Sequence, residues 1–184
     1  MIRTIPAVAA VTDEASQGKR LYGKIYILAE EDVDYGTLPT ITESESARTM
    51  SALTLKSGAT GWKEFNFAKY TPAATSEGSN GDITSSSTNT VTGTLAGESV
   101  EIDNFIQTVG RPVFIVTIDR FTMEKTIYGR PYSPMFFSSF NKRKNADNTS
   151  CDVNFTQESL FQPLKYTGDV VPNAGGSGGD GEED

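Results

Sequence analysis

The stretch "PVFIVTI", residues 112–118, contains seven consecutive uncharged residues, most of them β-branched or aromatic. It follows Gly110 and ends at the polar turn that starts with Asp119. A continuous apolar run of this length is typical of a β-strand that is buried on both faces, because a half-exposed strand would alternate apolar and polar residues. We therefore expect residues 112–118 to form a central strand with apolar cover on both sides.

Outward from this run, the apolar segments are short and turn residues are frequent, which favours an all-β domain. "RLYGKIYILA" (residues 20–29) is rich in β-branched and aromatic residues and predicts a strand. Leu53 and Leu55, then Phe65 and Phe67, alternate around "SGATG" and predict a hairpin. Further strand character is seen in "TVTGTLAGESVEI" (90–102), "KTIYG" (125–129), "MFFSSF" (135–140), "CDVNF" (151–155) and the closing segment 152–168.

Two segments do not fit this strand pattern. Asp103 precedes "NFIQTV", and Gly110 and Pro112 follow it, so we expect a short helix of about two turns with Phe105, Ile106 and Val109 facing inward. Residues 71–90 are almost all small and polar, and we expect a long loop or an arm that a partner orders. The expected fold class is all-β, a β-sandwich or β-barrel, with one short flanking α-helix and long loops.

The composition divides the 184 residues into three parts: an N-terminal arm (1–19), a β-rich domain (20–168) and a flexible acidic, glycine-rich tail (169–184). The tail supplies five of the eight net negative charges, so the remaining chain carries only −3. Its "GSGGDG" satisfies the spacing of a dinucleotide-binding loop but has no strand before it and no helix after it. The apolar run near residue 5 is too short for a secretory or membrane-spanning segment.

The chain has no histidine and one cysteine, which excludes Ser-His-Asp and Cys-His catalysis, zinc fingers and disulfides within the chain. We therefore expect a protein that is not an enzyme and has no cofactor and no metal. A net charge of −8 argues against tight binding of nucleic acid, which needs a basic surface.

Four acidic residues follow the first predicted strand. Their carboxylates are suitable calcium ligands, but their spacing is not that of an EF-hand, and a solvated acidic loop is the simpler interpretation. Cys151 is expected to be a small buried residue, and the aromatic residues near it are expected in the core or in subunit contacts. The acidic residues are Glu30, Glu31, Asp32 and Asp34, and the aromatic residues are Trp62, Phe136, Phe137, Phe140 and Phe155.

The loop predicted at residues 141–150 gathers three cations, Lys142, Arg143 and Lys144, in an otherwise acidic chain. Cations at a hairpin tip discourage edge-to-edge aggregation, which is one interpretation. The other is that the tip contacts the acidic residues 30–34 of a neighbouring subunit and sets its register. The second interpretation predicts that three glutamates at these positions, or raised salt, weaken assembly.

The order of the pieces, with "VEIDNFIQTVGRPVFIVTIDRFTMEKTIYGRPYSPMFF" as strand, short helix, buried strand and hairpin, resembles the tail tube proteins of tailed bacteriophages. The resemblance covers residues 20–168 and is one of layout, without a specific motif. It implies subunits that form stacked rings, commonly hexameric, around a channel with a mildly acidic wall through which the genome passes. It also implies stacking contacts from residues 1–19, 30–49 and 71–90.

We therefore expect a virion structural protein, a tail tube subunit that assembles in the host cytoplasm, with further copies of itself and other virion proteins as partners. No membrane contact and no tight nucleic-acid binding are expected. The alternative is a capsid decoration protein, or a head-fibre or adhesion β-sandwich, that binds capsids or glycans. An adhesion protein of this kind needs aromatic side chains exposed on one face.

Overall fold

The computed structural model describes residues 21–44, 47–68, 71–80, 85–145, 149–159 and 161–170. The expected N-terminal arm (1–19) lies outside the described residues. The same holds for the expected tail from residue 171 onward, whereas Asp169 and Val170 are described.

The described residues form an all-β fold with one short α-helix, as expected. Eleven strands join in one mixed sheet, with the order β2-β3-β11-β8-β7-β9-β10-β6-β5, and β1 and β4 branch from β7. All pairs are antiparallel except β3 with β11. The strands are β1 (Leu21–Ala29), β2 (Ile41–Glu43), β3 (Arg48–Met50), β4 (Lys63–Asn66), β5 (Ala73–Asn80), β6 (Ser85–Ala96), β7 (Pro112–Asp119), β8 (Lys125–Tyr128), β9 (Met135–Lys144), β10 (Thr149–Ser159) and β11 (Leu164–Tyr166); the helices are η2 (Glu30–Asp32) and α1 (Val100–Ile106).

The central position of β7 confirms the interpretation of residues 112–118. Strand β7 pairs with β1 along most of its length, with β8 from Ile115 to Ile118 and with β9 at its first two residues. Its six inner residues are all buried. Alternate side chains enter two different cores: Val113 and Ile115 point to one side, and Phe114 and Val116 to the other.

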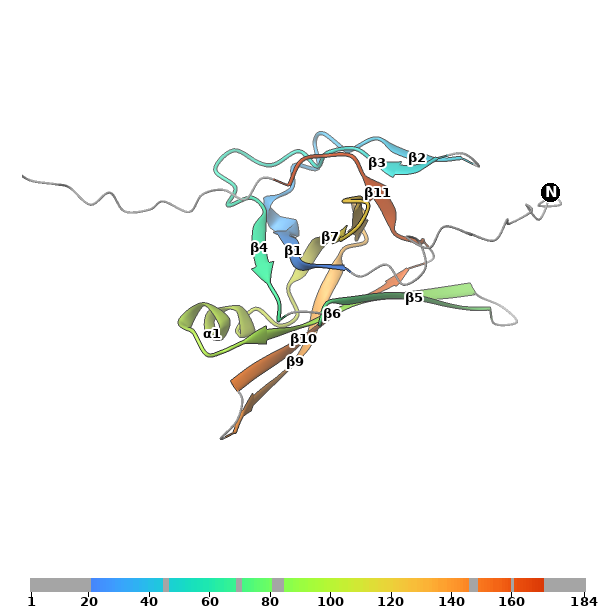
Figure 1. The fold of residues 1–184 in the computed structure, drawn as a ribbon. Coiled ribbons are helices and arrows are strands. Elements are labelled where there is room, and N and C mark those ends of the chain that lie inside the picture. Colours follow the sequence, from blue (N-terminus) through green and yellow to red (C-terminus); the bar gives the residue numbers. More distant parts are fainter. Residues whose placement is uncertain are drawn as a thin grey trace, which may run out of the picture.

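The sheet is folded so that β5, β6, β10 and β9 form one layer below β1, β4 and β7 (Figure 1). The first core lies between these two layers. Helix α1 packs at its side through Phe105, whose ring stacks on Phe137 with centroids 4.6 Å apart. The second core lies on the other side of β1 and β7, where Trp62 and Tyr166 meet edge to face. The layer β5-β6-β10-β9 thus buries only its inward face.

The hairpin predicted around residues 57–61 is wrong. Strand β4 pairs with β1, and Leu55 forms only an isolated bridge with Val33. The leucines before the turn and the phenylalanines after it do not face each other, because Leu53 belongs to the second core whereas Phe65 packs against the first.

The long loop predicted at residues 71–90 is also wrong, because β5 and β6 form a hairpin there. Strand β6 pairs with β5 on one side and with β10 on the other, so its backbone groups are satisfied within the sheet. A hydrogen-bond chain adds support: Ser76 donates to Asn89, and Asn89 donates to the buried Gln157. Backbone pairing and this chain replace the apolar contacts that the segment lacks.

The helix is confirmed, but it begins earlier than predicted. Ser99 is its N-cap and accepts a hydrogen bond from the Ile102 amide, whereas Asp103 lies in the first turn. Phe105 and Ile106 face the first core as expected, but Val109 lies beyond the helix and is 44% exposed. Within the described residues, the structure contains no helix of the length and apolarity that crossing a membrane requires.

Candidate functional site on the four-stranded layer

The outward face of the β5-β6-β10-β9 layer, here called the outer face, is a broad polar surface. In β10, Cys151, Val153 and Phe155 are buried on the inward side, so the residues between them point outward. Their partners on β6 are threonines, in the pairs Asp152–Thr94, Asn154–Thr92, Thr156–Thr90 and Glu158–Thr88. The outer face therefore presents hydroxyl, amide and carboxylate groups in regular rows.

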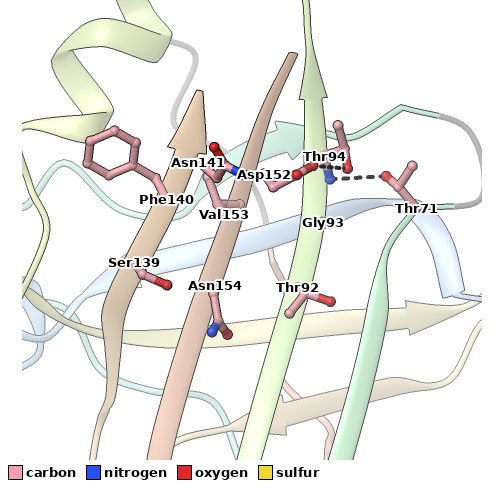
Figure 2. Close-up of a pocket in the computed structure, with 10 residues that line it drawn as sticks. All are labelled: Thr71, Thr92, Gly93, Thr94, Ser139, Phe140, Asn141, Asp152, Val153 and Asn154. Carbon is pink, nitrogen blue, oxygen red and sulfur yellow. Dashed lines mark hydrogen bonds between the residues drawn. The ribbon is translucent and has the colours of Figure 1, made fainter. Parts of the chain in front are cut away.

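A shallow hollow of about 280 Å³ lies on this face, over β6, β10 and β9. Figure 2 shows its lining residues on three neighbouring strands, with Thr71 beside β6. The Thr94 hydroxyl donates to Asp152 Oδ1 (2.7 Å), and the Thr94 amide donates to the Thr71 hydroxyl (3.1 Å). The buried Oδ1 of Asn154 accepts no hydrogen bond from the described residues.

This hollow has the chemistry of a hydrogen-bonding surface. Its one carboxylate, Asp152, is already bound by Thr94 and by Arg143 Nη2 (2.8 Å). No group of three His, Cys, Asp or Glu side chains among the described residues is placed to hold a metal ion. The groups present can exchange hydrogen bonds with water or with polar ligands.

The same layer has an unpaired edge on each side. Within the described part of the chain, β5 pairs with β6 alone. Strand β9 pairs with β7 only at Met135 and Phe136, and backbone bonds with residues 110 and 111 end at Phe137. Residues 138–144 of β9 thus have β10 on one side and no described strand on the other. Such edges carry unpaired N–H and C=O groups that a strand of another chain can join.

The three cations predicted in a loop lie in β9 instead, so the solvated ten-residue tip is wrong. Strand β9 runs to Lys144, and β10 begins at Thr149. The cause is the pairing itself: residues 141–144 pair with residues 149–152, and this register extends the hairpin beyond the aromatic residues.

Each of these cations has a carboxylate partner within the same chain. Lys142 Nζ contacts Asp103 (2.7 Å) and Glu98 (3.2 Å), and Lys144 Nζ contacts Glu98 (2.8 Å). The hydrogen bonds that Lys142 donates to Asp103 and then to Glu98 raise the pKa of Lys142, and those that Glu98 accepts from Lys144 and then from Lys142 lower the pKa of Glu98. These pairs tie the tip of the β9–β10 hairpin to the start of α1.

The four acidic candidates also have partners within the chain. Glu30 accepts from the Tyr35 hydroxyl (2.5 Å), and Asp32 accepts from the Thr60 hydroxyl (2.7 Å). Glu31 pairs with Arg111 (3.4 Å), and Asp34 caps the Gly36 amide (2.9 Å). Burial, followed by the hydrogen bond to Glu30, raises the pKa of Tyr35.

The structure does not bring the acidic and basic groups together within one chain. The predicted contact between subunits stays a prediction; it would join Lys142, Arg143 and Lys144 of one subunit to residues 30–34 of another. Such a contact would have to replace existing ion pairs, because the three cations are already paired with Glu98, Asp103 and Asp152 of their own chain. Sequence reasoning missed these partners, although Glu98 and Asp103 flank the helix start and Asp152 alternates with apolar residues.

The remaining candidates divide between core and surface. Cys151 is fully buried, and this burial raises the pKa of its thiol, as expected of a small buried residue. Trp62, Phe137 and Phe155 are core residues, whereas Phe136 and Phe140 are 46% and 43% exposed on β9. The exposed pair lies on the strand whose outer edge is unpaired.

Comparisons with known proteins found no matching family model, no similar curated protein and no similar solved structure.

Proposed function

We propose that this chain is a virion structural protein, a tail tube subunit that assembles into stacked rings around a channel that conducts the genome. The observation that carries this proposal is a four-stranded layer with a polar outer face and, among the described residues, an unpaired edge on each side. The proposal includes assembly in the host cytoplasm, contacts with other virion proteins, and no cofactor or catalytic activity.

The two edges support a ring because they lie on opposite sides of one layer. With the order β5-β6-β10-β9, strand β5 of one copy placed beside β9 of the next continues the sheet from subunit to subunit. The contact is head-to-tail, and a head-to-tail contact closes into a ring when its rotation divides the circle. The lengths also agree: β5 has eight residues, and the free part of β9 covers residues 138–144.

The charges of the outer face support its role as the channel wall. Glu77, Asp152 and Glu158 outnumber Arg143, which is itself paired with Asp152. A wall of this kind offers phosphate groups no strong cationic contact, so DNA can slide past it without being held. The other two cations of β9, Lys142 and Lys144, lie on the inward side with Cys151 and Thr149.

Electron microscopy and light scattering of the purified protein at rising concentration test this proposal. We expect rings or tubes; only monomer across all salt and protein concentrations would overturn it. Thr75→Lys should weaken assembly because a lysine on an edge strand discourages strand addition. Thr90→Lys is the matched control, since Thr90 pairs with Thr75 on the same face but lies in the interior of the layer.

A second candidate function is glycan or capsid binding by an adhesion or decoration protein. Tyr132 and Phe136, which are 74% and 46% exposed, line a hollow with Thr156 and Glu158 near the outer face. Aromatic rings beside hydroxyl and carboxylate groups suit a sugar, which offers an apolar face and hydroxyls. Glycan binding that is lost in Tyr132→Ala, by a protein that stays monomeric, would favour this function over a tube.

A further inference from the structure

The turn between β7 and β8 presents two large apolar side chains on a fixed backbone. Phe121 and Met123 are 61% and 58% exposed. Asp119 Oδ1 accepts hydrogen bonds from the amides of Phe121 (2.9 Å) and Thr122 (2.8 Å), and the Met123 amide donates to the Asp119 carbonyl (3.0 Å). These bonds hold the turn in one shape, so the two side chains are displayed without a large entropy cost on binding.

The backbone of this turn is also unusual. Met123 has φ = 56°, in the left-handed region that long side chains rarely adopt. A glycine or asparagine would relieve this strain, and a polar residue would remove apolar surface from water. A strained, exposed methionine beside an exposed phenylalanine is therefore a feature that folding alone does not require.

An apolar groove lies elsewhere among the described residues of the same chain, between β4 and α1. It has a volume of about 340 Å³ and is lined on its apolar side by Phe65, Leu95, Ile102 and Phe105. Its floor continues into the first core, because Phe105 contacts both Phe65 and Phe137 at 4.6 Å between ring centroids. The groove is large enough to receive an aromatic side chain.

The turn and the groove are built from different elements: the turn joins β7 to β8, whereas the groove is lined by β4, the end of β6 and α1. Neither surface belongs to the β5 or β9 edge, so one copy can use both while its sheet edges pair with neighbours.

We propose that Phe121 and Met123 of one copy dock into the β4–α1 groove of a second copy. The charges agree with this occupant: the groove is lined by Glu64 and Glu101 and by no cation, and Arg120 directly precedes Phe121. Glu64 is paired with Lys24, whereas Glu101 bonds only to its own backbone and Ser99 within the described residues. In this contact Arg120 would face Glu101 of the second copy when the Phe121 and Met123 side chains are seated.

This contact is head-to-tail, and it deepens the proposed function by supplying a joint between stacked rings. A head-to-tail contact leaves one turn and one groove unused after every addition, and it propagates from subunit to subunit when its rotation does not close a ring. Pairing of the β5 and β9 edges would then build each ring, and the β7–β8 turn would connect one ring to the next.

Disulfide trapping tests the contact directly. The full chain with Phe121→Cys and Ile102→Cys should form a ladder of linked species with oxidised glutathione, and a mixture of the two single variants should form only dimers. The single variants alone should give no product, because Cys151 is fully buried. Failure of the double variant to link more than the single variants would overturn the proposal. A second double variant, Val8→Cys with Ile102→Cys, would also overturn the proposal if its two cysteines formed a disulfide efficiently within one chain. That result would show that residues 1–19 cover the groove.

Assembly measurements separate this inference from the proposed function. The double variant Phe121→Ser, Met123→Ser should leave single rings intact and raise the protein concentration needed for stacking at least tenfold. The control Val109→Ser, which removes another exposed apolar side chain, should leave that concentration unchanged. Arg120→Glu should weaken stacking, and Glu101→Arg in the same chain should restore it. If the wild type forms tubes and the serine variant forms them equally well, the docking contact is wrong and the tube remains. If the wild type forms no rings but the cysteine pair links, the proposed function fails and the contact remains.

Discussion

The packing of Phe67 against Gly93 makes a sharp test of how the two layers meet. A Cβ at position 93 would lie 2.6–2.8 Å from three atoms of the Phe67 ring, which is closer than van der Waals contact allows. Phe67 is 7% exposed and belongs to the first core, so it has little room to move. Inserting a methyl group into such a core costs about 1–3 kcal/mol. In a domain of this size that corresponds to a fall in the unfolding midpoint of about 2–12 °C for Gly93→Ala.

Gly78→Ala is the matched control, because it adds the same methyl group to a neighbouring strand where the nearest atom lies 3.9 Å away. Differential scanning calorimetry of both variants gives the two midpoints. Phe67→Leu should partly restore Gly93→Ala, with an interaction energy of at least about 0.5 kcal/mol, because the two residues are in contact. A midpoint for Gly93→Ala equal to that of Gly78→Ala would refute the reasoning.

Three further predictions follow from contacts elsewhere in the chain. The hydrogen bond from Arg130 lowers the pKa of Glu43 below 4.5, so the Glu43 carboxylate contributes stability above pH 4.5, and this stability is lost as the pH falls through the lowered pKa. Urea titrations should therefore show that Glu43→Gln loses less stability below pH 4.5 than the wild type does. An equal loss in both proteins would contradict the pairing. Removing the residues after Val170 should shift the midpoint by no more than a few degrees, with about 1 kcal/mol or less at stake, whereas a cut after Gly168 should cost more because Val170 packs against the second core. In carboxyl NMR titrations, Lys144→Gln should raise the pKa of Glu98 toward its ordinary value; an unchanged titration would show that the pair does not form in solution.

The central strand could be predicted from the sequence because burial on both faces leaves a continuous apolar run. "PVFIVTI" contains one polar residue, Thr117, which is also buried, and β7 indeed supplies side chains to two cores. The short helix was also predictable, although its start was not, since Ser99 and Asp103 are both acceptable N-caps and only the backbone distinguishes them.

The β5–β6 hairpin was missed because its stability does not come from apolar residues of its own. The threonines at positions 88, 90, 92 and 94 alternate with inward residues such as Val91 and Leu95, which is a strand pattern. The segment before them, however, is small and polar, and it is held by pairing with β6 and by the Ser76–Asn89–Gln157 chain. A long-range partner such as Gln157 cannot be identified from local composition.

The residues that line the hollow were not predicted as a site, and of them only Phe140 was singled out, as a residue of the core or of subunit contacts. The cations of β9 were singled out correctly as unusual, but their partners Glu98 and Asp103 are about 40 residues distant in the chain. The unpaired edges of β5 and β9 depend on the strand order, which is a property of the whole sheet. The apolar β7–β8 turn and the groove that we pair with it were not expected at all, because exposure of Phe121 is visible only in the folded chain.

The pairing of β1 with β7 has a consequence for how the chain is made. Leu21 pairs with Asp119, so β1, the first of the described strands to leave the ribosome, waits for a partner synthesised about 100 residues later. At about 5–20 residues per second, that delay lasts roughly 5–20 s. Strand β4, which pairs with the other edge of β1 and arrives about 40 residues after it, is available much sooner. Early pairing with β4 would shield one edge of an apolar strand during synthesis, and loss of β4 should then appear first as poor yield of soluble protein.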